Sequence, residues 1–492
     1  MAGLFRWLDE RLNLRSVRLA LLDRAVPDRL TWWHTFGSAT LTLFLVQVVT
    51  GVVLATFYSP SPDHAYDSIQ YVEREVASGH LLRGIHHWAA SAMVVLVIAH
   101  MIRVFAMGAY KYPREINWLV GVGLFVLVMA FSFTGYLLPW DQKAYWATAV
   151  GTSIAGSTPG IGSALLALLR GGADLGAATL SRFYAFHVLW LPGLLGGLVL
   201  IHLIQVIRQG IASRPRALEQ GAPERTNDPA YPGYYHQAYE ASKQGGVRFY
   251  PDIVAKDAIV SALVVVTVVL LALTLGSPLD APADPTATSY IPRPEWYFLP
   301  LYQLLKLVPG SMESAVAVGV PTALLIAMLA LPFYDRRSSR NLLKRPVAVA
   351  CLGVILGASG LLLGAAVREA GPAVPPEVGR PLTSAERAGR ALFRAQKCGD
   401  CHVIAGEGGE GDTKGPELTE EGLKHSTAWL HSLIEDPIRF RSDTTDMPSF
   451  GPPTLSHREV EELAQYISSL RGNAGPEVQP EYHDTFPEAP QQ

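Results

Sequence analysis

Four histidines lie within two long apolar stretches, at spacings that could place them in pairs on single helix faces. His86 and His100 are 14 residues apart in one stretch, and His187 and His202 are 15 apart in the other. At about 100° per residue, 14 residues end about 40° short of four helical turns and 15 overshoot by about 60°, so each pair shares one face. The helical rise separates the two imidazoles of each pair by roughly 21–22 Å, a large part of a hydrocarbon core about 30 Å thick.

Two such helices facing each other would offer a bis-histidine site near each membrane surface, which is the arrangement of two b-type haems stacked across a bilayer. Ionisable side chains inside membrane spans are costly and usually functional, although a single histidine could be a hydrogen-bonded bundle residue or an interfacial anchor. Two matched pairs favour ligation of two haems by all four histidines. His87 neighbours His86 but points about 100° away, so we expect it to be structural or to face a haem propionate.

A second cofactor motif lies near the C-terminus, where Cys398, Cys401 and His402 form a Cys-x-x-Cys-His sequence. This pattern is typical of covalent c-type haem attachment, with the two thiols bound to the haem and His402 as the proximal iron ligand. Zinc would need a second ligand pair, and the third cysteine, Cys351, lies in an apolar stretch. A thioredoxin-like site would not require His402. The motif therefore favours a haem c.

A haem attached at this motif needs a second axial ligand, for which a methionine sulfur is typical. Met447 is the only methionine after the motif and is the expected ligand, with His425 and His431 as competing candidates. Helices expected near 384–396 and 456–471 bracket the motif and predict a small all-helical domain. Its acidic excess would attract a basic electron carrier, or is simply a solvated surface.

The composition predicts an integral membrane protein with a smaller soluble part. The 492 residues are 49% hydrophobic and 17% charged, whereas soluble domains carry about 25% charged residues. Seven apolar stretches are long enough to span a bilayer, and polar or Gly/Pro-rich segments separate them, which favours helices over barrel strands. We place the spans near residues 32–55, 81–105, 115–137, 183–207, 254–275, 316–334 and 346–367.

The distribution of charge predicts the orientation of these spans. Residues 1–31 are dense in charge and lack the apolar core of a cleavable signal peptide, so they predict an amphipathic helix on the membrane surface. Lysine and arginine collect in alternate loops, which places the N-terminus in the cytoplasm and, after seven crossings, the C-terminus outside. Covalent haem attachment occurs on the outer side of the bacterial inner membrane. Two unrelated signals thus agree that the C-terminal domain lies on the outer, periplasmic side.

Four glycines repeat the spacing of the histidines. Gly37 and Gly51 lie in the first span, Gly121 and Gly135 lie in the third, and each pair is 14 residues apart. Glycine at these points lets a flat macrocycle approach the helix backbone, whereas small residues for ordinary helix packing would predict no such register. We therefore expect the four glycines to line the haem sites.

These residues resemble cytochrome b of the quinol-oxidising bc-type complexes, as do the sequence GYLLPWDQ from Gly135 and the sequence PEWY from Pro294. The resemblance covers about residues 30–367. The 15-residue spacing and the Trp-Asp-Gln sequence are similar to the b6f-type branch, and residues 222–367 resemble its subunit IV, here fused in one chain. The C-terminal domain resembles a small class I cytochrome c. An all-α fold follows: a seven-span membrane bundle with a small helical cytochrome c domain.

One position departs from the pattern of the family. The b6f-type proteins attach an extra haem through a cysteine in the first helix, and the matching position here is Thr35, which cannot form a thioether. That haem is expected to be absent or held non-covalently, with the adjacent His34 either a ligand or a polar interfacial residue.

The chain is expected to have six parts. These are a surface helix at 1–31, a four-helix di-haem domain at 32–215, a subunit IV-like three-helix domain at 216–367, a tether at 368–383, the cytochrome c domain at 384–475 and a tail at 476–492.

The resemblance also assigns roles to the sites within the membrane. His86 and His187 would hold the outer, low-potential haem. His100 and His202 would hold the inner, higher-potential haem. Arg83 and Arg103 flank the histidines and would pair with haem propionates, unless they only extend to lipid headgroups. An inner-side quinone would bind near Arg208.

Quinol would bind on the outer side, between the end of the third span and the loop that bears Glu295. A quinol must lose its protons before it can release its second electron, so the pocket needs a base, and Glu295 is the candidate. The alternative is a loop carboxylate with no chemical task. Tyr297 and Tyr136 would line the pocket and order the quinol or water by hydrogen bonding.

The expected reaction divides the two electrons of quinol and is coupled to proton translocation. One electron passes through the two b haems, and the other passes to an iron–sulfur protein and then to the haem c. A Rieske centre needs two cysteines and two histidines, and Cys351 is the one cysteine of this chain outside the haem motif. A separate Rieske subunit is therefore implied. The other expected partners are a cytochrome c-type acceptor and a second copy of the chain in a homodimer; nucleic acid is not an expected partner. Two rivals are a di-haem membrane anchor of a dehydrogenase or hydrogenase, and a non-catalytic haem protein in assembly or sensing.

Overall fold

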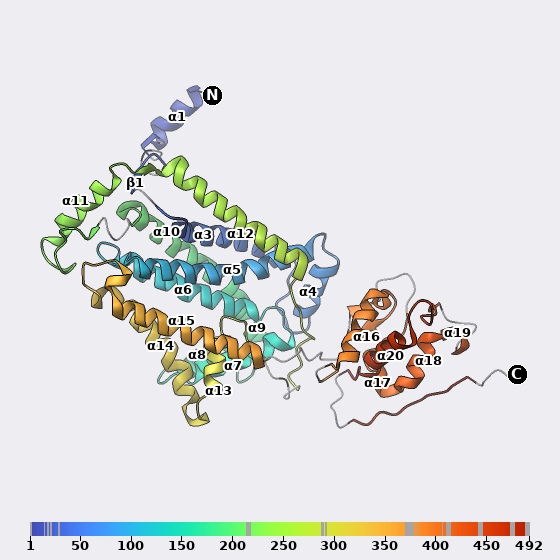
Figure 1. The fold of residues 1–492 in the computed structure, drawn as a ribbon. Helices are drawn as coiled ribbons and strands as arrows, with labels where there is room; N and C mark the ends of the chain where they lie inside the picture. Colours follow the sequence, from blue (N-terminus) through green and yellow to red (C-terminus); the bar gives the residue numbers. More distant parts are fainter. Residues whose placement is uncertain are drawn as a thin grey trace. The chain divides into compact units, whose positions relative to one another are not determined.

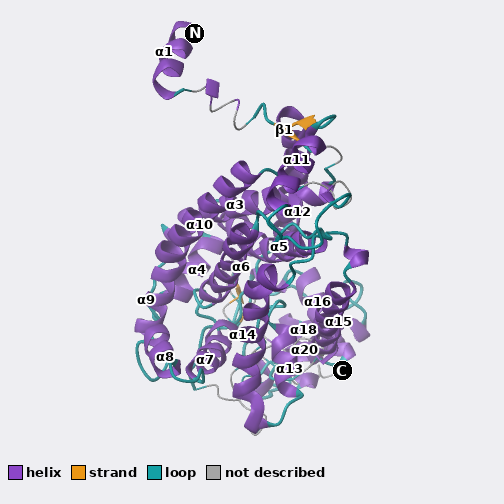
Figure 2. Ribbon diagram, turned by 90° about the vertical axis from the view of Figure 1, so that its left-hand side faces the viewer, coloured by secondary structure: helices purple, strands orange, loops and turns teal. Residues whose placement is uncertain are grey.

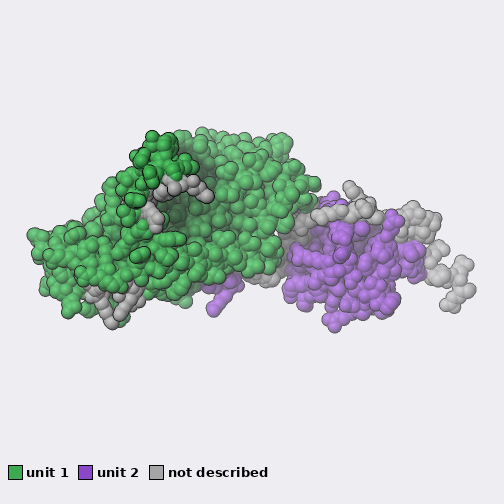
Figure 3. All heavy atoms as spheres, turned by 90° about the horizontal axis from the view of Figure 1, so that it is seen from above, with its two compact units in different colours: residues 1–363 green, residues 364–492 purple. Residues whose placement is uncertain are grey.

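The computed structural model of the protein divides into two compact units, residues 1–363 and 364–492 (Figure 3). Helices dominate both units, and the described strands are two residues long (Figure 2). The all-α class predicted from the sequence is therefore confirmed. The structure describes residues 2–13, 15–16, 19, 22–27, 30–212, 218–286, 290, 293–369, 378–380, 382–405, 407–409, 415–440, 446–472 and 478–487.

Seven helical segments are long and apolar enough to cross a membrane, which confirms the predicted number of spans. The fourth contains a π-helical turn, η2 (Phe186–Trp190), between α9 (Ala177–Ala185) and α10 (Leu191–Gln209). The others are η1 (Trp32–Thr35) with α3 (Phe36–Ala55), α5 (Gly79–Ala106), α6 (Glu115–Tyr136), η4 (Phe249–Ile253) with α12 (Val254–Leu275), α14 (Gly310–Tyr334) and α15 (Pro346–Glu369).

The bundle forms around α5, which packs against α3, α6 and α12, while α6 also packs against α10 and α14 (Figure 1). Leu43, Val94, Val128 and Leu195 form part of its apolar core. Apolar side chains also remain exposed along the outer faces of the spans, as expected for helices that contact lipid.

Shorter elements connect the spans. Residues 1–31 do not form one described surface helix: α1 covers Ala2–Leu12, whereas Ala25–Val26 form β1, which pairs antiparallel with β2 (Val247–Arg248). The other connecting helices are α4 (Ala65–Arg74), α7 (Gln142–Gly156), α8 (Gly162–Arg170), α11 (Tyr231–Lys243), α13 (Leu299–Lys306) and the 3-10 turn η5 (Leu342–Lys344).

The basic loops predicted to share one side of the membrane contact one another at one end of the bundle. Lys111 Nζ lies 2.9 Å from Asp335 Oδ1 and donates to the carbonyl of Arg337. Arg114 donates to the carbonyl of Gly210, and the β1–β2 pair joins the N-terminal segment to the stretch before α12. Burial lowers the pKa of Lys111 to about 8. These contacts link the regions expected to be cytochrome b-like and subunit IV-like.

The second unit is a compact group of helices on its own apolar core. Helix α16 (Ser384–Ala395) packs against α20 (His457–Ser468), and a Cβ at Gly389 would lie 2.0 Å from the carbonyl oxygen of Glu462, so only glycine permits this approach. Phe393 and Leu463 belong to the core. The other elements are η6 (Cys398–Asp400), β3 (Val403–Ile404) paired with β4 (Glu407–Gly408), α17 (Glu421–Lys424), α18 (Thr427–Glu435) and α19 (Pro437–Phe440).

Candidate functional site

The histidine pair expected on the outer side, here called the outer pair, meets inside the bundle; the pair expected on the inner side is called the inner pair. His86 on α5 and His187 in the π-helical turn have ring centroids 6.3 Å apart. An imidazole nitrogen lies about 2.0–2.1 Å from a bound metal ion, and the ring centroid roughly 1 Å farther, so two imidazoles sharing one metal have centroids roughly 6 Å apart. The two rings are therefore spaced to hold one haem iron between them.

Two buried threonines fix the orientation of these imidazoles. His86 Nδ1 lies 2.8 Å from Thr50 Oγ1, and His187 Nδ1 lies 3.1 Å from Thr134 Oγ1. Each hydroxyl already donates its proton to the carbonyl four residues earlier in its helix, so its oxygen accepts from the imidazole Nδ1–H. This tautomer leaves the Nε2 lone pair of each histidine for iron.

Each of the four predicted glycines faces one of the four histidines. A side chain at any of these positions would contact an imidazole ring, and the space is tightest at Gly135. A Cβ would lie 2.5 Å from His187 Cε1 at Gly135, 3.2 Å from His86 Cε1 at Gly51, 3.1 Å from His100 Cε1 at Gly37 and 3.7 Å from His202 Cε1 at Gly121.

The inner site contains buried polar atoms that suit a haem. His100 Nδ1 has no hydrogen-bond partner among the described residues, and neither do Nε and Nη2 of Arg103, one turn farther along α5. Unpaired guanidinium nitrogens of this kind fit a carboxylate such as a haem propionate. Arg208 lies exposed in the last turn of α10, six residues beyond His202.

Arg83, at the other end of α5, is engaged by the protein itself. Its Nη1 lies 2.5 Å from Glu73 Oε1, and its guanidinium donates to the carbonyls of Ser277 and Pro278 at 3.0 and 2.9 Å. These bonds tie α5 to the segment after α12. Arg83 therefore has a positioning task in addition to any contact with a propionate.

A cavity of about 480 Å³ lies beside the outer histidine pair. Its wall contains the three residues predicted for quinol chemistry: Tyr136 from the end of α6, and Glu295 and Tyr297 from the loop before α13. Arg83 and His87 also line it. Burial raises the pKa of Tyr297, and the hydroxyl of Tyr136 donates to the carbonyl of Arg293.

The carboxylate of Glu295 forms an ion pair inside this cavity. Lys143 Nζ, on α7, lies 2.8 Å from Glu295 Oε1. The side chains are 34% and 18% exposed, respectively, so the pair has access to water on one side. Lys143 follows the Trp-Asp-Gln sequence directly, but the contact joins residues 152 positions apart.

Asp141 holds the two walls of the cavity together. It caps α7 by accepting from the backbone N–H of Ala144 at 2.8 Å, and it accepts from the backbone N–H of Asp280 at 3.0 Å. Burial raises the pKa of Asp141. The end of α6 and the loop before α13 are thus fixed to each other.

In the second unit, the Cys-x-x-Cys-His motif is arranged for a proximal iron ligand. His402 Nδ1 lies 2.9 Å from the carbonyl oxygen of Pro416, which orients the ring and leaves Nε2 for iron. A Cβ at Gly415 would lie 2.6 Å from His402 Cε1. No disulfide joins the two cysteines, and burial raises the pKa of the Cys398 thiol to about 11.

The candidates for the distal ligand differ in their surroundings. Met447 packs against the same apolar core as Cys398. His425 Nδ1 lies 3.1 Å from Asp484 Oδ1, and its ring stacks on Trp429 with centroids 3.6 Å apart. His431 faces Glu435. The side chain of Met447 thus packs on the apolar core of the unit, whereas His425 and His431 each face a carboxylate.

Three families of known proteins match successive parts of the chain. Cytochrome b/b6/petB matches residues 21–210, cytochrome b(C-terminal)/b6/petD matches 282–376, and cytochrome c oxidase cbb3-type subunit III matches 384–467. The menaquinol:cytochrome c reductase cytochrome b subunit of Geobacillus thermodenitrificans is 43% identical over 217 residues, which cover 42% of this chain and 97% of the relative. This chain belongs to the cytochrome b family.

Two further comparisons agree with this cytochrome b assignment. Cytochrome b6 of Synechococcus elongatus is 39% identical over 212 residues, covering 43% of this chain and 99% of the relative. A solved structure described as a hyperthermophilic respiratory Complex III matches with a TM-score of 0.62 and 28% identity, over 75% of this chain and 92% of that one. The petD match confirms that this cytochrome b carries the subunit IV-like part in one chain, and the third match confirms the C-terminal cytochrome c domain.

The position expected to lack the extra thioether lies at the start of the first span of this cytochrome b. Thr35 is buried, and its hydroxyl donates to the carbonyl of Trp32 at 2.6 Å. The ring of His34 lies 3.1 Å from Thr31 Oγ1. Both side chains thus take part in the local turn that begins the span.

Sequence reasoning missed four residues that complete the sites. Thr50 and Thr134 each directly precede one of the predicted glycines, a pattern that could have revealed them. Gly415 follows the haem motif without a recognisable spacing. Lys143 is adjacent to a recognised segment, but only the fold shows its partner.

Proposed function

We propose that this cytochrome b is the electron-transferring subunit of a membrane quinol:cytochrome c reductase, with two haem b and one haem c per chain. The named relatives and the Complex III neighbour support this activity. The observation that carries the proposal is the cavity of about 480 Å³. It gives the Glu295 loop and the outer histidine pair a common space, so a quinol bound there would lie beside both a base and a haem.

We assign the ligands of the three haems from the arrangement of the donor atoms. His86 and His187 would hold the outer haem b, with Nδ1 bonds that leave both Nε2 atoms available. His100 and His202 would hold the inner haem b, with Arg103 facing a propionate. The ligands of the haem c would be His402 and Met447, with thioethers to Cys398 and Cys401. When bound, these groups accept and release single electrons.

The protein side chains would remove the protons of the quinol. Glu295 forms an ion pair with Lys143 at 2.8 Å, and its carboxylate is the group that would accept a proton from the quinol. A quinol hydroxyl that donates to Glu295 would take the place of the lysine. Once Glu295 has accepted the proton of that hydroxyl, its carboxylic acid would no longer be paired with Lys143. It could then release the proton to water on the side where Lys143 is exposed. Tyr136 and Tyr297 would orient the ring, while Asp141 keeps the two walls of the cavity in place.

The direction of the reaction follows from the expected topology. Quinol would be oxidised on the outer side of a bacterial inner membrane, and a quinone would be reduced on the inner side near Arg208. A Rieske subunit would take one electron from the quinol, and the cytochrome c domain, whose His402 and Met447 would hold the haem c, would pass it to a cytochrome c-type acceptor. A homodimer is the expected assembly.

The first test counts and separates the haems. Pyridine-haemochrome analysis of the purified chain should give two b haems for each c haem, and a redox-titrated visible spectrum should resolve two b potentials. Two c haems per chain would mean that a further haem is attached despite Thr35. One b haem or none would contradict the assignment of four histidine ligands.

The second test separates quinol oxidation from simple electron conduction. In the purified complex, Glu295→Gln should slow quinol-dependent reduction of the haems at least about 100-fold, because general bases contribute factors of this size. The matched control is Glu313→Gln, an exposed carboxylate in the first turn of α14, which should leave the rate unchanged. A di-haem anchor would show b-haem reduction without reduction of the haem c, and unaffected turnover in the Glu295 variant would remove its proposed role.

A further inference from the structure

Three metal-ligating side chains meet on the surface of the second unit, outside the haem motif. His431 and Glu435 are one turn apart on α18, and His457 is the first residue of α20. Their ligand atoms all lie within 4.8 Å of one another. Glu435 Oε1 lies 2.8 Å from His457 Nδ1, and Glu435 Oε2 lies 3.7 Å from His431 Nδ1. One carboxylate thus stands between two imidazoles.

We propose that His431, Glu435 and His457 form a binding site for a divalent transition metal of the zinc type. Two imidazoles and one carboxylate are a donor set that zinc uses in sites with an open fourth position. Tetrahedral zinc bonds of about 2.0–2.2 Å place the donor atoms roughly 3.3 Å apart, so closing the site requires shifts of roughly 1 Å. His457 is 73% exposed and can make this adjustment.

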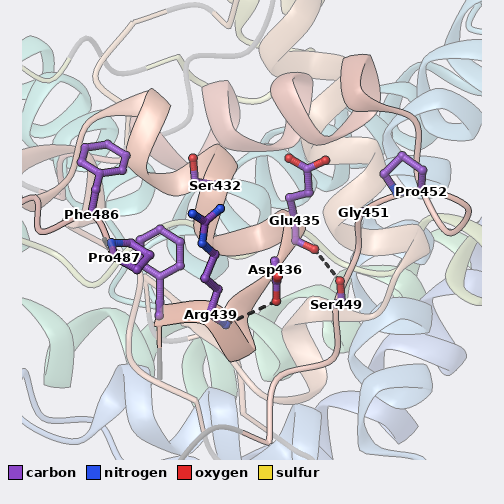
Figure 4. Close-up of a pocket in the computed structure, with 10 residues that line it drawn as sticks. Ser432, Glu435, Asp436, Arg439, Ser449, Gly451, Pro452, Phe486 and Pro487 are labelled. Carbon is purple, nitrogen blue, oxygen red and sulfur yellow. Dashed lines mark hydrogen bonds between the residues drawn. The ribbon is translucent and has the colours of Figure 1, made fainter. Parts of the chain in front are cut away.

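The backbone around Glu435 is fixed independently of any metal. The carbonyl of Glu435 accepts from the backbone N–H of Gly451 at 3.2 Å and from the hydroxyl of Ser449 (Figure 4). The carboxylate of Glu435 points away from Ser449 and Asp436 in this view. The ligand is therefore placed before the metal arrives, which lowers the cost of binding.

The fourth coordination position would face solvent, because His457 is 73% exposed, and it would take a water molecule or a small ligand. Such an open position distinguishes this site from a closed structural zinc site, in which four protein ligands surround the ion.

The site would join the two ends of the segment that carries Met447. Glu435 is the last residue of α18 and His457 the first of α20, and Met447 lies between them in the sequence. The backbone N–H of Phe450 also bonds to the carbonyl of Ile434. A metal bound to both helix ends would limit the opening of this segment. The metal site itself depends only on its three ligands, whereas its effect on haem ligation rests on the proposed role of Met447.

Zinc binding to the purified, haem-loaded full chain tests the site. With zinc chloride and a chromophoric chelator as competitor, the wild-type chain should bind one more ion than the His431→Ala/His457→Ala double variant. Each single alanine variant and Glu435→Gln should bind this ion at least tenfold more weakly. The matched control, His483→Ala, removes an exposed histidine of the same unit and should retain the ion. Pyridine-haemochrome analysis of each variant verifies that the unit still folds around its haem.

Equal zinc stoichiometry in the wild type and the double variant would overturn the site. Hydrogen exchange tests the effect on the segment, because the amides of Phe450 and Gly451 bond to the end of α18. Zinc should slow exchange in the peptide that contains them at least several-fold in the wild type and leave the Glu435→Gln variant unchanged. Unchanged exchange in the wild type at saturating zinc would overturn the joining of the two helix ends. Both measurements are independent of quinol turnover.

Discussion

The most demanding prediction concerns the glycines that face the histidines. The distance from a Cβ added at the glycine to the imidazole differs from one glycine to the next. Gly135→Ala would place a Cβ 2.5 Å from His187 Cε1, whereas carbon atoms in contact stay about 3.5–4.0 Å apart. The ring or the helix must therefore move by about 1 Å. Overpacking of this kind costs about 1–3 kcal/mol, which corresponds to a roughly 5- to 140-fold loss of affinity for the outer haem at 1.4 kcal/mol per factor of ten.

Gly121→Ala is the matched control, because its Cβ would lie 3.7 Å from His202 Cε1, an ordinary contact. The covalently attached haem c serves as an internal standard in the same chain. Pyridine-haemochrome analysis should give a b-to-c ratio that falls from 2:1 toward 1:1 in Gly135→Ala and remains 2:1 in Gly121→Ala. If Gly135→Ala retained both b haems with unchanged potentials, or if Gly121→Ala lost one, the histidine–glycine pairing would not explain haem binding.

Three further predictions follow from contacts within each unit. Thr50→Val and Thr134→Val each remove the acceptor of an imidazole Nδ1–H, and we expect a roughly 10- to 100-fold loss of outer-haem affinity, measured by haem titration. Gly415→Ala would place a Cβ 2.6 Å from His402 Cε1 and should reduce the haem c content. Gly399→Ala should not reduce it, because its Cβ would lie 3.8 Å from Phe393 Cε1, an ordinary contact. Burial lowers the pKa of Lys111 to about 8, so between about pH 8 and 10.5 the unfolded chain binds more protons and stability should rise with pH; thermal loss of the b-haem absorbance should show this rise in the wild type and less of it in Lys111→Met.

The sequence allowed the spans and the histidine pairs to be predicted because both depend on local periodicity. Apolar stretches of the right length require helices in lipid, and the 14-residue spacing places His86 and His100 on one face regardless of the rest of the fold. The same local reasoning identified the four glycines. Their individual assignments, such as Gly135 to His187, required the packing of one helix against another.

The residues that escaped prediction act through contacts that local patterns do not encode. A threonine in a helix most simply bonds to the carbonyl one turn back, as Thr50 and Thr134 do, and nothing in that pattern reveals the second bond to a histidine. Lys143 reaches Glu295 across 152 residues of sequence. Residues 1–31 were expected to form one surface helix because they are dense in charge and lack an apolar core, but β1 pairs with a strand more than 200 residues away.

The fourth span shows how the structure accommodates the unequal histidine spacings. His187 lies within the π-helical turn Phe186–Trp190, in which the backbone N–H of Leu191 bonds to the carbonyl five residues earlier. Such a turn accommodates one extra residue without rotating the rest of the helix. The 15-residue gap to His202 therefore has the phase of a 14-residue gap in a regular helix, and the two histidine pairs match. Pro192 lies two residues after this turn and lacks the N–H that a regular helix would use at this point.

This explanation predicts opposite effects for two single-residue deletions. Deleting Leu189, whose side chain is 66% exposed within the turn, should convert the turn to regular helix and leave a true 14-residue gap, so both b haems should remain. Deleting Val95, which is 50% exposed on α5 between His86 and His100, should rotate one histidine by about 100° out of its site, so one b haem should be lost. The b-to-c ratio measures both outcomes. Loss of a b haem in the Leu189 deletion, or retention of both in the Val95 deletion, would show that the π-helical turn does not set the register of the pair.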